Sequence, residues 1–247
     1  MIYLQQLSNS VETLPILTAV IDTALCVGAG GSSGSLADKP IVRNAERNLL
    51  VPASQLKGRL RHECEKMARG LGWSICESPN SQTMCPQRAG VQGNFECDEY
   101  EFTDEITGKK VHHCLICQIF GNPALPSRAI FDDLICTEDP DNLPPEVLRP
   151  GVTINRARRT AEDQKLYFLE TSPANTQLRF EGRIHLQPNL KPDLPDYAKA
   201  LIWAGLKHIK ALGGSKSAGL GWLHWEELLP LEVDEAVWDF LAKGGLT

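Results

Sequence analysis

The stretch CVGAGGSSGSLADKPIVRNAERNLLVPASQLKGRLR, residues 26–61, joins a glycine-serine loop, one acidic residue, a short extended segment and a basic helix. The loop from Gly28 to Ser35 has almost no side-chain bulk, so its backbone N–H groups can approach a large anion closely. A polyphosphate or a nucleic acid fits this description. The loop matches neither the GxxxxGK[ST] phosphate loop nor a clean GxGxxG fingerprint, which disfavours nucleotide hydrolysis.

Pro52 and Ser54 are predicted to begin a helix that covers about residues 54–69. Lys57 and Arg61 share one face of this helix, and the apolar residues recur at helical spacing on another face, at Leu56, Leu60, Cys64 and Met67. Unpaired N–H groups at the helix start would add to these cations in binding an anion.

Composition and charge limit the class of protein. A chain of 247 residues that is 42% hydrophobic can bury a sizeable core, and it has neither a long apolar run nor a signal peptide at its start. We therefore expect a cytoplasmic protein with no membrane contact. The net charge of −6 disfavours binding to nucleic acid through overall charge, but a local basic groove remains compatible with it. The eight cysteines favour core packing or metal binding over disulfides, and Cys26 and Cys136 lie on predicted core strands.

The remaining patterns predict an antiparallel sheet with helices on one face. A buried first strand is expected over 14–27, a further strand over 127–136 and a projecting hairpin over 152–169. Residues 177–186 alternate strictly between apolar and polar, which predicts a strand with one buried face. A helix over 195–212, a glycine loop over 213–221, a closing strand over 220–225 and a short helix over 234–241 follow. This order predicts an α+β, ferredoxin-like fold. The two glycine loops would lie near each other if the first and last strands pair.

Several motifs in this order resemble the RAMP superfamily: LADKPIVRN, LLVPASQLKGRLRHECE, CQIFG, an Asn-Arg-x-Arg hairpin and LGGSKSAGLGWLHWE. The motifs resemble in particular the guide-RNA-binding backbone subunits of type III, III-D-like, CRISPR effector complexes. It implies a modified RNA-recognition fold in a single domain over residues 1–247. It also implies a cysteine-rich insertion at 73–113 and a thumb hairpin at about 150–170. The implied partners are guide RNA, complementary target RNA and other effector subunits in a multi-subunit filament.

In the family, an aspartate between the glycine segment and a "PVIRD"-like strand cleaves target RNA, and the matching residue here is Asp38. The resemblance implies a divalent cation, Mg or Mn, for this step. Asn44 stands where the family commonly has an acid. The alternative is that Asp38 caps a turn, a usual role for Asp beside Pro.

The RNA-binding residues are predicted in three groups. The first glycine loop and its continuation contribute Gly30, Gly31, Ser32, Lys39 and Arg43. The basic helix contributes Ser54, Lys57, Arg59 and Arg61, although a charge run is more often a solvated face. The hairpin and the second glycine loop contribute Asn155, Arg156, Arg158, Arg159, Gly214 and Lys216. Arginines and aromatic residues on a hairpin suit single-stranded RNA, since both stack on bases.

Four cysteines have spacing typical of a zinc site: Cys76, Cys85, Cys114 and Cys117. Cys64, Cys97, His112 and His113 are alternative ligands, and unliganded buried thiols are the other interpretation. The predicted function is a guide-RNA-binding subunit that cleaves target RNA and carries structural zinc. The alternatives are a catalytically silent scaffold subunit and a stand-alone endonuclease that processes the guide precursor.

Overall fold

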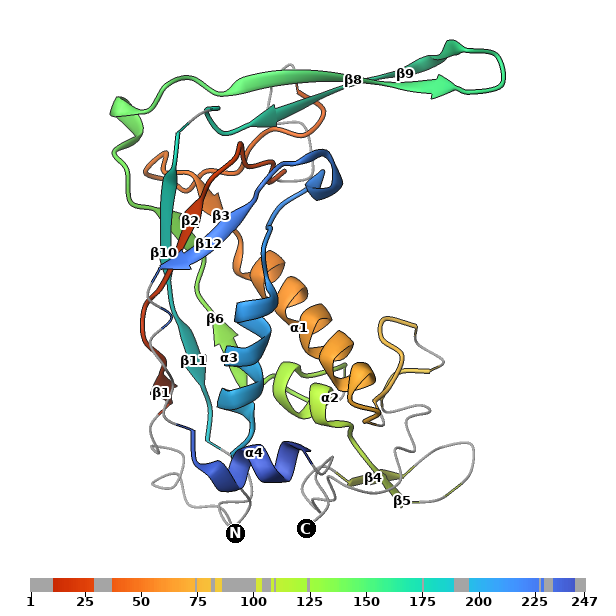
Figure 1. Cartoon of the computed structure of the whole chain (residues 1–247), viewed down its shortest axis with the longest axis vertical. Helices are drawn as coiled ribbons and strands as arrows, with labels where there is room; N and C mark the ends of the chain where they lie inside the picture. The colour runs from red at the N-terminus through yellow and green to blue at the C-terminus, as the bar shows by residue number, and fades with distance from the viewer. Residues whose placement is uncertain are drawn as a thin grey trace.

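The computed structural model describes residues 11–28, 37–73, 75–80, 83–85, 101–103, 108, 110–123, 125–174, 176–188, 196–226, 228 and 233–242. Its centre is an antiparallel sheet of five strands, shown in Figure 1. In sheet order these are β12 (Leu223–Glu226), β2 (Leu17–Ile21), β10 (Leu178–Gly182), β7 (Leu134–Cys136) and β3 (Leu50–Val51).

Two split βαβ units make up this centre. The first runs from β2 through α1 (Ala53–Gly70) to β7, and β10 lies between its two strands. The second runs from β10 through α3 (Ala198–His208) to β12, and β2 lies between its strands. This interleaving is the ferredoxin-like arrangement, so the predicted fold is confirmed.

Helices α1 and α3 lie side by side on one face of the sheet (Figure 1). Gly205 of α3 allows this contact, because a Cβ there would lie 2.7 Å from Cδ1 of Leu60 and 2.8 Å from Sγ of Cys64. The predicted apolar stripe of α1 is buried at Leu56, Leu60 and Cys64. Together with Phe180 and Leu178 from the sheet, these residues belong to the main hydrophobic core.

The strand predicted over 177–186 is interrupted. Its second half, β11 (Ile184–Leu186), belongs to a separate three-stranded sheet with β1 (Glu12–Thr13) and β6 (Ala129–Phe131). The break lies beside Gly182, where a Cβ would lie 2.8 Å from the carbonyl oxygen of Asp133. The alternation of buried and exposed residues continues across the break, which is why the sequence pattern does not reveal it.

The insertion and the residues directly after it contain elements that the sequence pattern did not specify. These are the short helix α2 (Leu115–Phe120) and the hairpin of β4 (Glu101–Thr103) and β5 (Lys110–His112). All six residues of α2 are buried, so no amphipathic period marks it as a helix. The predicted terminal helix is α4 (Glu235–Ala242), and two single 3₁₀ turns cover Pro140–Asn142 and Lys216–Ala218.

A long hairpin projects from the body of the protein at the end opposite α4 (Figure 1). Its strands are β8 (Val147–Asn155) and β9 (Thr160–Thr171), which pair antiparallel with a register shift between Val152 and Ile154. Both strands extend beyond the predicted range of 152–169 at the hairpin base, where Val147 pairs with Thr171. The hairpin covers the residues for which a projecting hairpin was predicted from the sequence. None of the helices in the described ranges has the length and apolarity needed to cross a bilayer.

Candidate nucleic-acid interface and metal centre

The second glycine loop, the hairpin base and the segment around Asp38 meet along residues 24–28, which continue β2. On one side, Gly221 N donates to Ala24 O at 3.0 Å and Gly214 N donates to Cys26 O at 2.7 Å. On the other side, Ser172 N at the end of the hairpin donates to Leu25 O at 2.9 Å. Strands β2 and β12 pair antiparallel, so the condition for the two glycine loops to lie near each other is met. Gly30, Gly31 and Ser32 of the first loop lie outside the described residues.

The second glycine loop is packed tightly against this strand continuation. Gly213 and Gly221 have φ of 87° and 70°, and added Cβ atoms would lie 2.6 Å from Cys26 O and 1.9 Å from Leu212 O. Both positions require glycine. The Lys216 side chain donates to Gly213 O at 2.9 Å, so its ammonium group lies on the loop itself.

Asp38 lies at the base of the hairpin. Its Oδ2 accepts a hydrogen bond from Phe168 N at 2.7 Å, and its own N–H donates to Phe168 O at 3.0 Å. Lys39 forms a bridge with Leu169, and both Asp38 and Lys39 are exposed. Among the described residues, Oδ1 of Asp38 has no hydrogen-bond partner. The carboxylate is thus held in place through one oxygen and open to a ligand through the other.

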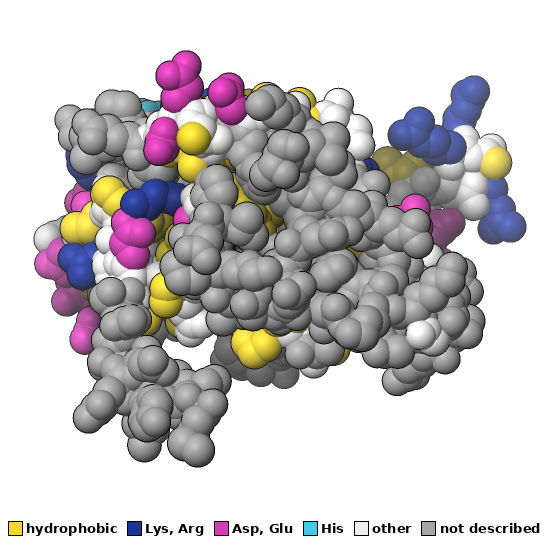
Figure 2. All heavy atoms as spheres, turned by 90° about the horizontal axis from the view of Figure 1, so that it is seen from below, with side chains coloured by type: hydrophobic (Ala, Val, Ile, Leu, Met, Phe, Trp, Pro, Cys, Tyr) yellow, Lys and Arg dark blue, Asp and Glu magenta, His cyan; other side chains and the backbone are white. Residues whose placement is uncertain are grey.

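The hairpin tip presents three arginines to solvent. Arg156, Arg158 and Arg159 are exposed, and within the described part of the chain none of them forms an ion pair. Asn155 shapes the turn that carries them, because its Oδ1 accepts the N–H groups of Ala157 and Arg158 at 3.1 Å each. Figure 2 shows Lys and Arg side chains gathered at this projecting end. The tip is therefore a solvated cationic surface available to phosphates.

The basic residues near α1 have a different placement. Arg43 pairs with Glu146 and also donates to Arg47 O. Arg59 pairs with Glu63 at 2.8 Å. The pKa of Lys57 is lowered, mainly by burial and to a lesser extent by the positive charge of Arg61. Ser54 is exposed in the first turn of α1. The arginines of this group are largely committed to intramolecular partners, which favours structural roles for them.

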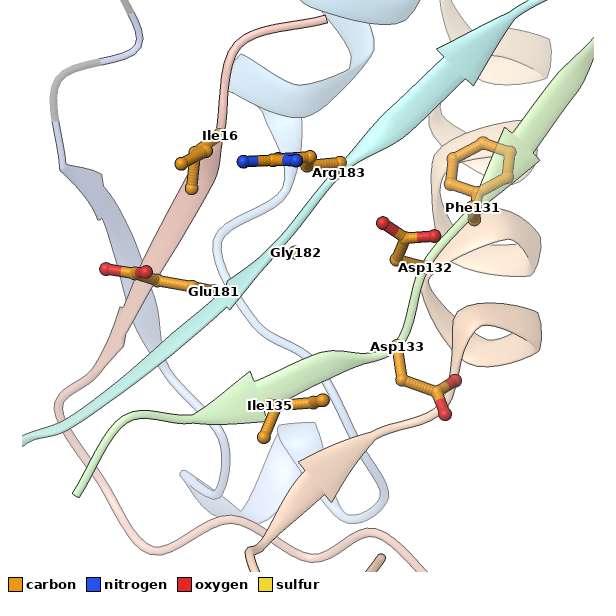
Figure 3. A pocket seen from close by; sticks show the side chains of 8 residues that line it. All are labelled: Ile16, Phe131, Asp132, Asp133, Ile135, Glu181, Gly182 and Arg183. Atoms are coloured by element: carbon orange, nitrogen blue, oxygen red, sulfur yellow. The ribbon is translucent and has the colours of Figure 1, made fainter. Parts of the chain in front are cut away.

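The open face of the central sheet offers few rings for base stacking. Since Leu178 and Phe180 face the helices, Arg179 and Glu181 face the other way. Among the described residues of the five strands, the only ring on that face belongs to His224 of β12, and the exposed Trp222 directly precedes this strand. A hollow of about 620 Å³ lies here, at the breaks between the two sheets. Figure 3 shows its lining, with the carboxylates of Asp132, Asp133 and Glu181 and the single cation Arg183. An acidic hollow repels a phosphate chain, so the hairpin is the better candidate for nucleic-acid contact.

Four cysteines meet beside α1. The Sγ atoms of Cys76, Cys85, Cys114 and Cys117 all lie within 4.8 Å of one another, and Cys76 Sγ is 3.6 Å from both Cys114 Sγ and Cys117 Sγ. Four sulfurs bound tetrahedrally to zinc at the usual bond length stand about 3.8 Å apart. The four buried thiols therefore fit a metal such as zinc.

The contacts within the cluster shift the acidities of these thiols in opposite directions. The interaction with Cys114 lowers the pKa of Cys76 and of Cys117, and it raises the pKa of Cys85. Opposite pKa shifts are expected when adjacent thiols share protons. A bound metal ion would take the place of those protons.

The alternative ligands lie elsewhere or are not described. Cys64 packs in the interface between α1 and α3, where its thiol contacts Leu201 O at 3.5 Å. The His113 ring contacts Asn122 Nδ2 at 2.8 Å, and burial lowers the pKa of His113. Cys97 and the His112 side chain lie outside the described residues.

The family model of the RAMP superfamily matches residues 18–224. The chain belongs to the RAMP superfamily. Comparison with curated proteins gives no significant match. RAMP membership indicates a CRISPR-associated, RNA-binding protein that works with CRISPR RNA and other subunits.

Two residues that hold the segment from Asp38 to Ile41 were not predicted from the sequence. Glu170 Oε2 accepts the N–H of Ile41 at 2.8 Å, and Phe168 binds both backbone and side chain of Asp38. Ile41 and Glu170 are 129 residues apart in the chain. Their pairing depends on where the hairpin folds back, and no local pattern marks it.

Proposed function

We propose that this chain is a guide-RNA-binding backbone subunit of a type III CRISPR complex, which assembles with other effector subunits in a filament. The observation that carries the proposal is the exposed arginine tip of the projecting hairpin, in a chain whose net charge is negative. Cations concentrated at one projecting site bind RNA phosphates even when the chain as a whole is acidic. Arginine planes at the tip would also stack on bases that leave the RNA helix.

We further propose that Asp38 acts in cleavage of the complementary target RNA. Attack by a 2′-hydroxyl requires that oxygen to stand in line with the leaving 5′-oxygen, a geometry that a stacked helix does not offer. A hairpin that displaces a nucleotide would relax this constraint beside its own base, where Asp38 lies. The exposed Oδ1 could accept the hydroxyl proton, or it could hold a Mg or Mn ion that is bound mainly by phosphate oxygens.

A second candidate, a catalytically silent scaffold, is favoured by one specific contact. The hydrogen bond from Phe168 N to Asp38 gives the carboxylate a structural role in fixing the hairpin, whatever its chemistry. The two candidates differ in what an asparagine at position 38 would do. An amide oxygen accepts the same N–H, but the amide neither takes up a proton nor neutralises a metal ion.

The test is a complex reconstituted with guide RNA and a matched target, carrying Asp38→Asn or Asp38→Ala. Under the catalytic proposal, Asp38→Asn keeps guide and target binding while cleavage falls by about 10²–10⁴-fold, the usual effect of losing an acid-base group. Asp38→Ala should lose cleavage and also loosen the hairpin. Normal cleavage by the Asp38→Asn complex would leave Asp38 with a structural role alone.

We also propose that the cysteine cluster holds structural zinc. The insertion at 73–113 shows little apolar periodicity, and a bound metal would supply folding energy that this segment cannot obtain from a core.

A further inference from the structure

The guanidinium group of Arg61 lies against the cysteine cluster. Its Nη2 donates to Sγ of Cys117 at 3.5 Å, its Nη1 donates to the carbonyl oxygen of Gly121 at 2.8 Å, and its Nε donates to Oε1 of Glu65 at 3.0 Å. The side chain is only 18% exposed. Each guanidinium nitrogen thus has a protein partner, and the planar group is fixed in one orientation.

These three contacts connect separate parts of the chain. Arg61 and Glu65 lie on α1, Cys117 lies within α2, and Gly121 follows the last residue of α2. The Gly121 N–H in turn donates to Cys117 O at 2.9 Å. The guanidinium therefore holds both a cluster sulfur and the end of the helix that carries it, and a shift of Arg61 would move Cys117.

The charge of the cluster explains why a cation is needed there. Four thiolates around a divalent ion carry a net negative charge, and an unbalanced charge in a buried site is unfavourable. Arginine suits this position, because it keeps its charge when buried and donates in several fixed directions. A hydrogen bond to a ligand sulfur also tunes how firmly that ligand binds the metal.

We propose that Arg61 is a positioning residue of the metal centre, which balances its charge and fixes Cys117, and that it does not contact RNA. This inference rests on the proposed zinc site. It replaces the phosphate-binding role that the basic sequence of α1 suggests for Arg61. It also explains why a charged side chain points into the interior between α1 and α2.

The experiment uses the full-length protein loaded with zinc or with cobalt(II) as a spectroscopic probe. Zinc affinity is measured by chelator competition for the wild type, Arg61→Met, Arg61→Lys and the control Arg69→Met. Arg69 lies on the same helix and pairs with the same Glu65, at 3.8 Å, but forms no hydrogen bond to the cluster. Methionine keeps an unbranched stem like that of arginine and removes the charge and the guanidinium donors.

We expect Arg61→Met to weaken zinc binding by about 10–100-fold, as is usual for a lost partner of a metal ligand, and to shift the thiolate-to-cobalt absorption. Arg61→Lys should restore part of the affinity through its charge, and Arg69→Met should match the wild type. If Arg61→Met and Arg61→Lys both leave affinity and absorption unchanged, Arg61 has no role at the metal. A wild-type protein that binds neither metal overturns the zinc site itself, and with it this inference.

Discussion

The carboxylate of Asp133 accepts a hydrogen bond from the backbone N–H of Ala53, with 2.7 Å between Oδ1 and N. Ala53 is the first residue of α1, and Asp133 comes from the turn between β6 and β7. The carboxylate thus satisfies a free donor and places negative charge at the positive end of the helix. The start of α1 already has an intramolecular anion, which weakens the expectation that it binds phosphate.

Replacing Asp133 with Ala should lower the free energy of unfolding by about 0.5–2 kcal/mol, the usual cost of a lost helix cap. Asp133→Asn should recover part of this loss, because the amide oxygen still accepts the N–H while the favourable charge is absent. Urea unfolding of the three proteins measures the difference. Equal midpoints for Asp133→Ala and wild type would show that this contact adds nothing to stability.

Gly221 and Gly219 offer a matched pair in the second glycine loop. Both have positive φ, 70° and 85°, but an added Cβ meets Leu212 O at 1.9 Å at Gly221 and nothing within 4 Å at Gly219. Gly219→Ala should therefore lower the free energy of unfolding by only about 1–2 kcal/mol, the cost of a left-handed backbone conformation for alanine. Gly221→Ala adds a backbone clash and should destabilise substantially more, as thermal unfolding would measure. A similar loss at both positions would mean that the loop adjusts around Gly221.

Removal of Arg156, Arg158 and Arg159 together should weaken RNA binding and reduce its dependence on salt. Each phosphate contact to single-stranded nucleic acid contributes about 0.7 to the slope of log affinity against log salt, so three lost contacts reduce the slope by about 2. Filter binding or fluorescence anisotropy at several salt concentrations measures this. A control with Arg47, Lys66 and Arg69 changed to Ala alters the net charge equally at positions that form ion pairs. Equal slopes for both triple variants would exclude the tip as the RNA contact.

The metal site predicts about one zinc per purified chain by elemental analysis. Cys117→Ser should lose that zinc and lower the melting temperature, because metal binding and folding of the insertion are linked. Cys136→Ser is the control, since Cys136 is equally buried but lies in β7 away from the cluster. Folded wild-type protein that contains no zinc and is unaffected by chelators would contradict the prediction.

The sequence predicted the framework well, because periodicity reports burial directly. The helical stripe of α1, the alternation along β10 and the glycine-bounded closing strand each mark one buried face. Periodicity gives no signal in α2, where every residue is buried. It also misses the break between β10 and β11 at Gly182 and Arg183, because the alternation of buried and exposed residues continues through that break.

Charge was a weaker guide to the candidate site than apolar periodicity was to the fold. Arg61 and Arg158 have the same residue type in similarly basic surroundings, yet one contacts Cys117 and the other is exposed at a hairpin tip. Their partners are set by elements that come together only in the folded chain. The spacing of the cysteines did identify four thiols that converge. A tetrahedral metal site permits only certain spacings between its ligands, whereas a surface charge can stand at many positions in the sequence.

The projecting hairpin also affects how the chain behaves before it meets RNA. Beyond its base, β8 and β9 pair only with each other among the described strands, so both outer edges carry unpaired backbone groups. Such edges can join a second strand, and Ile154 and Leu166 are both 60% exposed there. The charged residues Glu162, Asp163 and Lys165 of β9 interrupt this apolar edge, as gatekeeper residues do in other proteins. They would delay self-association during synthesis, and their loss would make the RNA-free chain prone to aggregate.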